Sequence, residues 1–288
     1  MNAKSITKIQ FIIAVVLYGT IGMFLRFTTL PSAFVAMCRG LIGSTFIILY
    51  MKVKKIPFDW DPIKKNLFWL ILSGMLLGLN WIFLFAAYDT TTIAIASLCN
   101  YTAPMIVLIV SPIVLKEKIE KKKLPFVFLA FLGIIFVSGV LEGQKGNFLG
   151  ITLGLIAALC FVGIVLSNKM MHDISAYEKA IIQLLTSSVT ILPYVIFHDL
   201  KTPLIINTQS ILIVLIVGII HTGLAYCFYF NGLTILSVQS VVILGYIEPV
   251  VSVLTSFFIL HENISLLGWV GTILILSSVL TDIESKEG

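Results

Sequence analysis

The sequence predicts an all-α integral membrane protein in which ten transmembrane helices form two inverted five-helix repeats. Three observations predict this fold class: the composition, the lengths of the apolar runs and an internal repeat. Of the 288 residues, 59% are hydrophobic and only 11% are charged, which is far outside the composition of soluble globular domains. We therefore expect lipid, rather than water, to surround most of the chain.

The apolar runs have the length of bilayer spans, because a hydrocarbon core about 30 Å thick requires roughly 20 apolar residues in a helix. In the first half they lie near residues 9–26, 33–51, 67–87, 91–112 and 124–141. In the second half they lie near 148–167, 177–197, 209–231, 237–260 and 264–283. The first run follows Lys4 and Lys8, as in a signal peptide, but it lacks a small-residue cleavage site and the repeat needs this span. We therefore predict that it is the first helix.

A shift of 145 residues superimposes one half of the sequence on the other. The matched pairs are Tyr101 and Tyr246, Pro104 and Pro249, Ser111 and Ser256, Leu115 and Leu260, and Glu117 and Glu262. We divide the chain into a first repeat, residues 1–142, and a second repeat, residues 143–288. Because each repeat holds an odd number of spans, the second must enter the bilayer upside down, a construction typical of secondary transporters.

The basic residues indicate the orientation in the membrane. With the N-terminus inside, the cytoplasmic segments hold 15 of the 19 basic residues. The outer side holds Arg26, Lys145 and Lys201, and Arg39 lies within a span. The positive-inside rule therefore predicts that both termini are cytoplasmic. The lysine-rich segment 116–123 then lies inside, and its repeat counterpart 261–265, which has no lysine, lies outside.

Several function classes are disfavoured by what the sequence lacks. The four cysteines lie in apolar runs at spacings that match no metal or disulfide framework. We find no His-Glu-x-x-His motif, no Cys-His cluster and no glycine-rich phosphate loop, so we expect neither an enzyme nor a metal or cofactor site. The net charge of +5 arises from loop lysines that topology explains, so we expect no nucleic-acid partner.

Several motifs occur in register across the ten spans. They are Arg39, Pro104 with the segment Leu115-Lys116-Glu117-Lys118-Ile119, the run Phe131-Leu132-Gly133-Ile134-Ile135, Glu248-Pro249 with Leu260-His261-Glu262-Asn263-Ile264, and Gly268 to Gly271. On these motifs the chain resembles the EamA-type branch of the drug/metabolite transporter superfamily over nearly its whole length. The resemblance implies a pseudo-symmetric transporter of the plasma membrane with a central cavity, and with the fourth and ninth helices near its centre.

The sequence departs from that family in two places. Tyr18-Gly19 stands where the family often has tryptophan before glycine, and Glu262-Asn263-Ile264 stands where it has glutamate followed by leucine. We expect these changes to affect substrate choice rather than the fold.

Charged residues within spans cost about 2.5–3.5 kcal/mol each on insertion scales, so Arg39 and Glu248 need a reason to be there. Either they line a substrate cavity, or Arg39 extends to the membrane surface and Glu248 is a neutral acid that supports the kink at Pro249. At 1.5 Å per residue, Arg39 lies about 9 Å and Glu248 about 18 Å from the outer ends of their spans, which argues against a direct ion pair. His221 lies at about the depth of Glu248, so it is the better candidate partner, and together they could carry a proton. The alternative for His221 is a neutral imidazole bonded to a neighbour.

Pro104 and Pro249 occupy the same position in the two repeats, in the middle of a span. Proline frees a backbone carbonyl and kinks a helix, so we identify these two residues as hinge candidates. Small and polar residues around them, such as Gly245 and Ser252, serve either a cavity wall or close helix packing.

The remaining candidates are polar or amphipathic residues within spans, each of which either lines the cavity or packs against lipid or a neighbouring helix. They are Tyr18, Asn80, Trp81, Asn100, Tyr101, Gln183 and Tyr226. Gln183 belongs to a polar stripe of its span, with Ser187, Thr190 and Tyr194, which serves either as a cavity wall or for hydrogen bonding between helices. Trp81 and Tyr226 correspond under the 145-residue shift and form an aromatic pair that could stack on a substrate.

We therefore expect a secondary active transporter that moves a small organic solute across the plasma membrane by alternating access. An amino acid or related metabolite is favoured as solute, export is favoured as direction, and proton coupling is a further hypothesis. The alternatives are a membrane receptor or scaffold without transport, and an importer of a cationic or nucleoside-like solute. Besides solute, protons and lipid, a second copy of the chain is a candidate partner, because small-residue faces in the fifth and tenth spans serve either a homodimer or internal packing.

Overall fold

The computed structural model describes residues 3–116, 121–143, 147–201, 203–261 and 264–284, and it confirms the ten predicted helical spans. The first repeat holds α1 (Ala3–Arg26), α2 (Ser32–Val53), α3 (Trp60–Thr90), α4 (Ile93–Asn100) followed by α5 (Ala103–Val114), and α6 (Leu124–Val137). The second holds α7 (Phe148–Lys169), α8 (Ala176–Phe197), α9 (Thr208–Ile216) followed by the π-helix η4 (Val217–Leu224) and α10 (Ala225–Ile235), α11 (Val238–Gly245) followed by α12 (Ile247–Phe258), and α13 (Leu266–Glu284).

Nine of the helical segments in the described part of the chain are long and apolar enough to cross a membrane, and Leu266–Leu280 in α13 is a shorter apolar helix. Together they show a multi-pass membrane protein. Two of the motifs noted in the sequence, Glu117 to Ile119 and Glu262-Asn263, lie outside the described residues.

The fourth and ninth spans are each broken at the same repeat position. The first break lies at Tyr101-Thr102, between α4 and α5, and the second lies at Tyr246, between α11 and α12. The broken spans also begin alike, because the hydroxyls of Thr92 and Ser237, which are 145 residues apart, accept hydrogen bonds from the first turns of α4 and α11. The internal repeat is therefore expressed in the caps and breaks of these helices as well as in their sequence.

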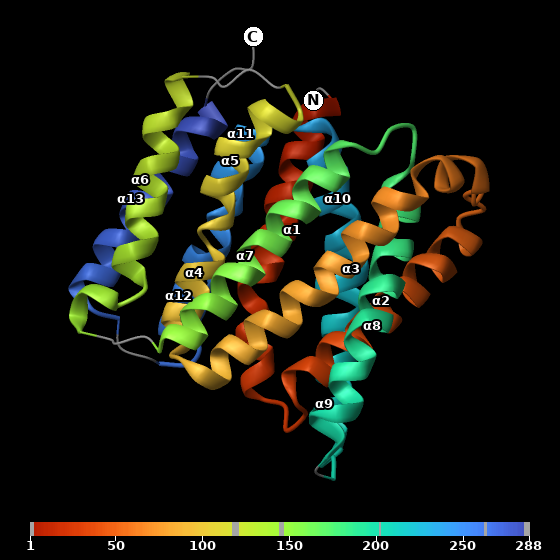
Figure 1. Ribbon diagram of the computed structural model, residues 1–288, viewed down its shortest axis with the longest axis horizontal. Helices are drawn as coiled ribbons and strands as arrows, with labels where there is room; N and C mark the ends of the chain where they lie inside the picture. Colours follow the sequence, from red (N-terminus) through yellow and green to blue (C-terminus); the bar gives the residue numbers. More distant parts are fainter. Residues whose placement is uncertain (1–2, 117–120, 144–146, 202, 262–263, 285–288) are drawn as a thin grey trace.

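The chain begins and ends at the same end of the bundle, which we call the terminal end; we call the opposite end the far end (Figure 1). In Figure 1, α5 and α11 occupy the terminal half of the broken spans, and α4 and α12 occupy the far half. The half-helices α4 and α11 therefore approach the middle of the bundle from opposite ends.

The helices α6 and α13, the fifth and tenth spans, pack side by side at one edge of the bundle (Figure 1). Gly133 and Gly271 allow the two backbones to meet, and Ser278 donates a hydrogen bond to the carbonyl of Phe126 over 2.6 Å. The 145-residue shift relates Gly133 to Ser278 and Phe126 to Gly271, so the two contacts are counterparts. Of the two uses expected for these small residues, the structure shows internal packing.

We predict that Gly133→Ala lowers the melting temperature of the protein. A methyl group at this position would lie 2.7 Å from the carbonyl oxygen of Gly271, and overpacking of this kind costs about 1–3 kcal/mol, more than the gain of up to about 1 kcal/mol in helix propensity. Thermal unfolding in detergent measures the effect. Gly22→Ala is the control, because a methyl group there meets no atom within 4 Å. Equal melting temperatures for Gly133→Ala and wild type would show that the α6–α13 crossing is looser than described.

Candidate functional site

A cavity of about 410 Å³ lies at the centre of the bundle and extends toward its far end. Its walls come from α1, α2, α3, α4, α7, α10 and α12. Leu25 and Arg26 at the end of α1, Ser32 at the start of α2 and Ile93 at the start of α4 line the far side. The cavity therefore lies between the two repeats, and both broken spans contribute to it.

Eight of the sequence-predicted candidates line this cavity. They are Tyr18, Arg39, Asn80, Trp81, Asn100, Tyr101, Tyr226 and Glu248. The depths estimated along separate spans set Arg39 and Glu248 apart, yet both side chains face the same cavity. Their contact with a substrate stays a prediction.

Arg39 lies in the wall, where it interacts electrostatically with Glu248 but forms no ion pair within the described part of the chain. Its side chain is 7% exposed, and its guanidinium lies 4.0 Å from the centre of the Trp81 ring. Such a cation–π contact contributes up to about 2 kcal/mol where water is excluded. The Nε atom is buried without a hydrogen-bond partner in the described structure, so this donor remains available.

Aromatic rings continue the wall around Arg39. The Tyr226 ring meets the Trp81 ring edge-on at 6.4 Å, and the Tyr18 ring lies 5.3 Å from that of Tyr226. The hydroxyl of Tyr18 is buried without a hydrogen-bond partner among the described residues. The predicted aromatic pair of Trp81 and Tyr226 is thus in contact, and it forms one surface with Tyr18.

Glu248 lies in the first turn of α12, where the positive end of the helix dipole favours a carboxylate. The Tyr101 hydroxyl donates a hydrogen bond to the Glu248 carboxyl group, which joins the two broken spans. Gly19 of α1 packs directly against the backbone of Glu248, since a methyl group there would lie 2.6 Å from its carbonyl oxygen. This close approach requires glycine at position 19.

Asn80 connects three helices beside the cavity. Its amide nitrogen donates to the Asn100 side-chain oxygen over 3.1 Å and to the carbonyl of Ala157 over 2.8 Å. Asn80 and Asn100 therefore line the cavity and also hold α3, α4 and α7 together.

His221 has partners other than Glu248 among the described residues. Its Nε2 atom lies 2.9 Å from the Thr20 hydroxyl, which itself donates to the carbonyl of Leu17 over 2.7 Å. Because the single proton of Thr20 is used there, Nε2 of His221 must be the donor between them. The Phe24 ring packs edge-on against the imidazole at 4.9 Å. His221 thus forms a hydrogen bond to a neighbour, which is the alternative to pairing with Glu248 that the sequence left open. It is not among the residues that line the cavity.

Gln183 lies in a closed hydrogen-bonded network between α3, α7 and α8. Its Oε1 atom accepts from Ser73 over 2.6 Å and from Asn168 over 3.2 Å, and its amide nitrogen donates to Asn168 over 3.1 Å. All three side chains are fully buried. Of the two roles expected for Gln183, the structure shows hydrogen bonding between helices.

The hinge candidates lie directly after the two breaks. Pro104 is the second residue of α5 and Pro249 is the third residue of α12. Proline is tolerated in the first turn of a helix because the missing N–H has no intrahelical partner there. Whether the chain bends at these points during function stays a prediction.

Sequence reasoning missed some of the residues that line the cavity. Tyr229 and Phe230 lie three and four residues after Tyr226, on the same face of α10, and this helical spacing could have identified them. Phe161 has no comparable signal, because it is one of 20 phenylalanines in an apolar chain. The π-helix around His221 was also not predicted.

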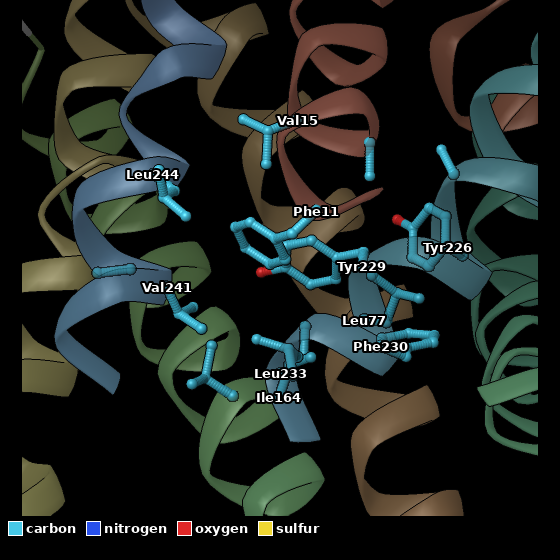
Figure 2. Packing of buried hydrophobic residues seen from close by; sticks show 14 of the residues in the cluster. Phe11, Val15, Leu77, Ile164, Tyr226, Tyr229, Phe230, Leu233, Val241 and Leu244 are labelled. Carbon is cyan, nitrogen blue, oxygen red and sulfur yellow. The ribbon is translucent and has the colours of Figure 1, made fainter. Parts of the chain in front are cut away.

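The cavity is closed toward the terminal end by tightly packed side chains. The Phe11 ring stacks on the Tyr229 ring at 5.1 Å, and Figure 2 shows Leu233, Ile164 and Val241 around this pair. Phe11 and Leu233 have no exposed surface. Within the described residues, the cavity thus extends toward the far end and is bounded by packed side chains on the terminal side.

Two lysines hold the terminal end of α10. Lys169 donates to the carbonyl of Leu236 over 2.5 Å, and Lys179, which is 1% exposed, donates to the Thr234 hydroxyl over 2.8 Å. Cations stabilise the negative end of a helix dipole. Lys169 and Lys179, which the sequence assigned to cytoplasmic segments, therefore belong to the packed end of the bundle.

We predict that Gln183→Leu lowers stability without changing solute binding. The substitution leaves Asn168 and Ser73 short of partners in a buried site, which costs about 1–3 kcal/mol for each unsatisfied group. Thermal unfolding measures the loss, and the affinity for any solute identified by thermal shift measures the site. A large change in affinity at an unchanged melting temperature would contradict this assignment.

Comparison with known proteins agrees with this architecture. The model of the EamA-like transporter family matches residues 6–139 and again residues 148–281. The uncharacterized transporter YxxF of Bacillus subtilis (strain 168) is 25% identical over 292 residues, covering 99% of this chain and 92% of that protein. An uncharacterized transporter of Archaeoglobus fulgidus is 26% identical over 273 residues, covering 93% of each chain.

A more distant relative and a solved structure are also similar over most of the chain. Protein PecM of Dickeya dadantii (strain 3937) is 23% identical over 248 residues, covering 85% of this chain and 80% of that protein. A crystal structure with 17% sequence identity covers 96% of this chain and 98% of its own chain at a TM-score of 0.81, which shows the shared fold. With the family match extending over both repeats, the chain belongs to the EamA-like transporter family.

Proposed function

We propose that this membrane transporter is a secondary active transporter that moves a small organic solute, an amino acid or a related metabolite, by alternating access. The observation that carries the proposal is the cavity of about 410 Å³ with Arg39 and Glu248 both in its wall. This volume lies within the range of about 300–1,000 Å³ typical of small-molecule sites. A solute with a carboxylate and an amine would find a charge of opposite sign for each group.

The repeat symmetry supports a role in binding for both charges. The 145-residue shift relates Arg39 to Leu184 and Glu248 to Ala103, so each charge occurs in one repeat only. Residues that build the repeated features of the fold, such as Pro104 and Pro249, occur in both halves. Arg39 and Glu248 therefore serve something that the two halves do not share, and a bound solute is asymmetric in this way.

The difference between the two ends of the bundle supports alternating access. The cavity extends to the far end and is closed at the terminal end by Phe11 and Tyr229. The distribution of lysines favours cytoplasmic termini in the plasma membrane, so we assign the described conformation to an outward-open state. Movement of one repeat against the other would close the far end and open the terminal end. Export, the favoured direction, would release solute from the described conformation.

Proton coupling in this proposal rests on Glu248 alone, since His221 bonds to Thr20. Glu248 belongs to the cavity wall and contacts the other broken span through Tyr101, so its charge can respond to movement of either repeat.

We predict that Arg39→Lys and Glu248→Gln each reduce solute exchange in proteoliposomes at least tenfold. Lysine cannot reproduce the planar contact with Trp81, and glutamine removes the charge that would face a cationic group. The solute is first identified by a thermal-shift screen of amino acids, nucleosides, polyamines and quaternary amines, because a ligand of the folded state raises the melting temperature. Counterflow of the labelled solute then measures exchange.

Lys201→Gln is the control for this experiment, because Lys201 lies in the short helix η3 (Asp199–Lys201), outside the cavity lining. Wild-type exchange in both cavity variants would exclude the proposed site. A stabilising solute that is never exchanged would favour a receptor, and uptake driven only inward would favour an importer.

We predict that the double variant Pro104→Ala, Pro249→Ala binds solute but exchanges it more slowly. Alanine supplies the missing N–H groups, which lets each span continue as a regular helix and stiffens the two breaks. Binding is measured by thermal shift and turnover by counterflow. Single variants separate the two breaks, and unchanged turnover in the double variant would exclude a hinge function.

A further inference from the structure

A second, smaller cavity of about 50 Å³ lies between the two helix breaks, on the terminal side of the large one. The two cavities share Asn100, Tyr101, Phe161, Tyr229 and Glu248 in their walls. A water molecule requires at least about 10–15 Å³ by this measure, so the small cavity has room for an ion with one or two waters. It is too small for the solute of the large cavity.

The two prolines leave two backbone oxygens of residues beside this cavity without their usual helical donor. Pro104 has no N–H to donate to the carbonyl of Asn100, and Pro249 has none to donate to the carbonyl of Gly245. Asn100 and Gly245 both line the small cavity. In a hydrocarbon layer such carbonyls need another partner.

The same residues are the carboxyl ends of two half-helices. α4 ends at Asn100 and α11 ends at Gly245, and neither has a basic residue in its last turn. Each helix carries about half a negative elementary charge at this end. Two negative helix ends therefore meet at one cavity, and each is followed along the chain by the positive end of the next half-helix, α5 or α12.

Two side chains supply further oxygen atoms at this cavity. The Glu248 carboxyl lines the cavity and, beyond the hydrogen bond from Tyr101, retains lone pairs for a further partner. Tyr246 also lines the cavity, and its hydroxyl is fully buried without a hydrogen-bond partner among the described residues. Its repeat counterpart Tyr101 does have one, in Glu248.

We propose that the small cavity binds a monovalent cation of the sodium class, held by the Glu248 carboxylate, the carbonyls of Asn100 and Gly245, and the Tyr246 hydroxyl. Hard cations prefer oxygen ligands, and unwound carbonyls at half-helix ends coordinate sodium in other secondary transporters. A cation here lies beside the carboxylate and the carbonyl oxygens of both helix ends. Because Glu248 lines both cavities, the ion and the solute would bind next to each other.

The experiment is a titration of the full-length protein in detergent with NaCl at constant ionic strength, balanced with choline chloride, at one fixed pH. We expect the melting temperature to rise by about 3 °C or more when Na⁺ exceeds its Kd about tenfold. Binding of ²²Na⁺ to the same protein is expected to reach one ion per chain. No solute is needed, so the ion site is tested separately from the proposed function.

Two tyrosine variants form a matched pair. Tyr246→Phe removes a buried hydroxyl of the small cavity and should abolish or strongly reduce the Na⁺ response, whereas stability in choline should not fall, since an unpartnered group is lost. Tyr18→Phe removes a buried, unpartnered hydroxyl of the large cavity only and should keep the full Na⁺ response. Glu248→Gln should lose the response entirely, and if that variant does not fold, the tyrosine pair decides.

Three results would overturn the proposal. They are a melting temperature that does not depend on Na⁺, an equal response to choline, and a Na⁺ response that survives in Tyr246→Phe. A response to pH without any response to Na⁺ would replace the cation with a proton at Glu248. Coupling of the ion to transport rests on the proposed function. Na⁺ binding without a Na⁺ requirement for solute exchange would support the site and count against coupled transport.

Discussion

Inside a hydrocarbon layer, every backbone N–H and C=O group must find a partner within the protein, and this constraint governs the centre of the molecule. The ten spans satisfy it along most of their length, and two of them are interrupted, at Tyr101-Thr102 and at Tyr246. Their ends lie at cavities lined by other helices rather than at the lipid surface. The breaks thus explain why the cavities lie where they do. The same breaks place Glu248 in the first turn of a helix in the middle of the bundle.

The scaffold is symmetric, whereas the chemistry built on it is not. Helix caps, breaks, prolines and the α6–α13 contacts all follow the 145-residue repeat, as expected of groups that build the fold. The charged wall residues do not follow it. Arg39 lies over Trp81 on one side of the cavity, and Glu248 accepts from Tyr101 at the meeting point of the broken spans. The repeated residues therefore build the scaffold, and the two charged residues of the cavity wall occur in one repeat each.

The spans, the repeat and a kink near each proline could be predicted from the sequence, because length, hydropathy and proline position are local properties. The partners of Glu248 could not. The position of a residue along a span gives its depth in the membrane, but not the direction in which its side chain points. That direction depends on the helical geometry of the whole turn, and the π-helix at His221 changes it. His221 accordingly meets Thr20. Gln183 shows the same limit, since a polar stripe looks identical whether it faces a cavity or, as here, Ser73 and Asn168.

The closed terminal end sets an energetic condition on any cycle of conformations. Movement of one repeat against the other that opens this end would separate Phe11 of α1 from Tyr229 of α10. A ligand of equal affinity for both conformations cannot drive this change, however tightly it binds. To shift two conformations from a ratio of 1:99 to 99:1, a ligand must bind the favoured conformation more tightly than the other by about 5.5 kcal/mol. A ligand whose contacts all lie in the described cavity wall would therefore stabilise the conformation with the terminal end closed.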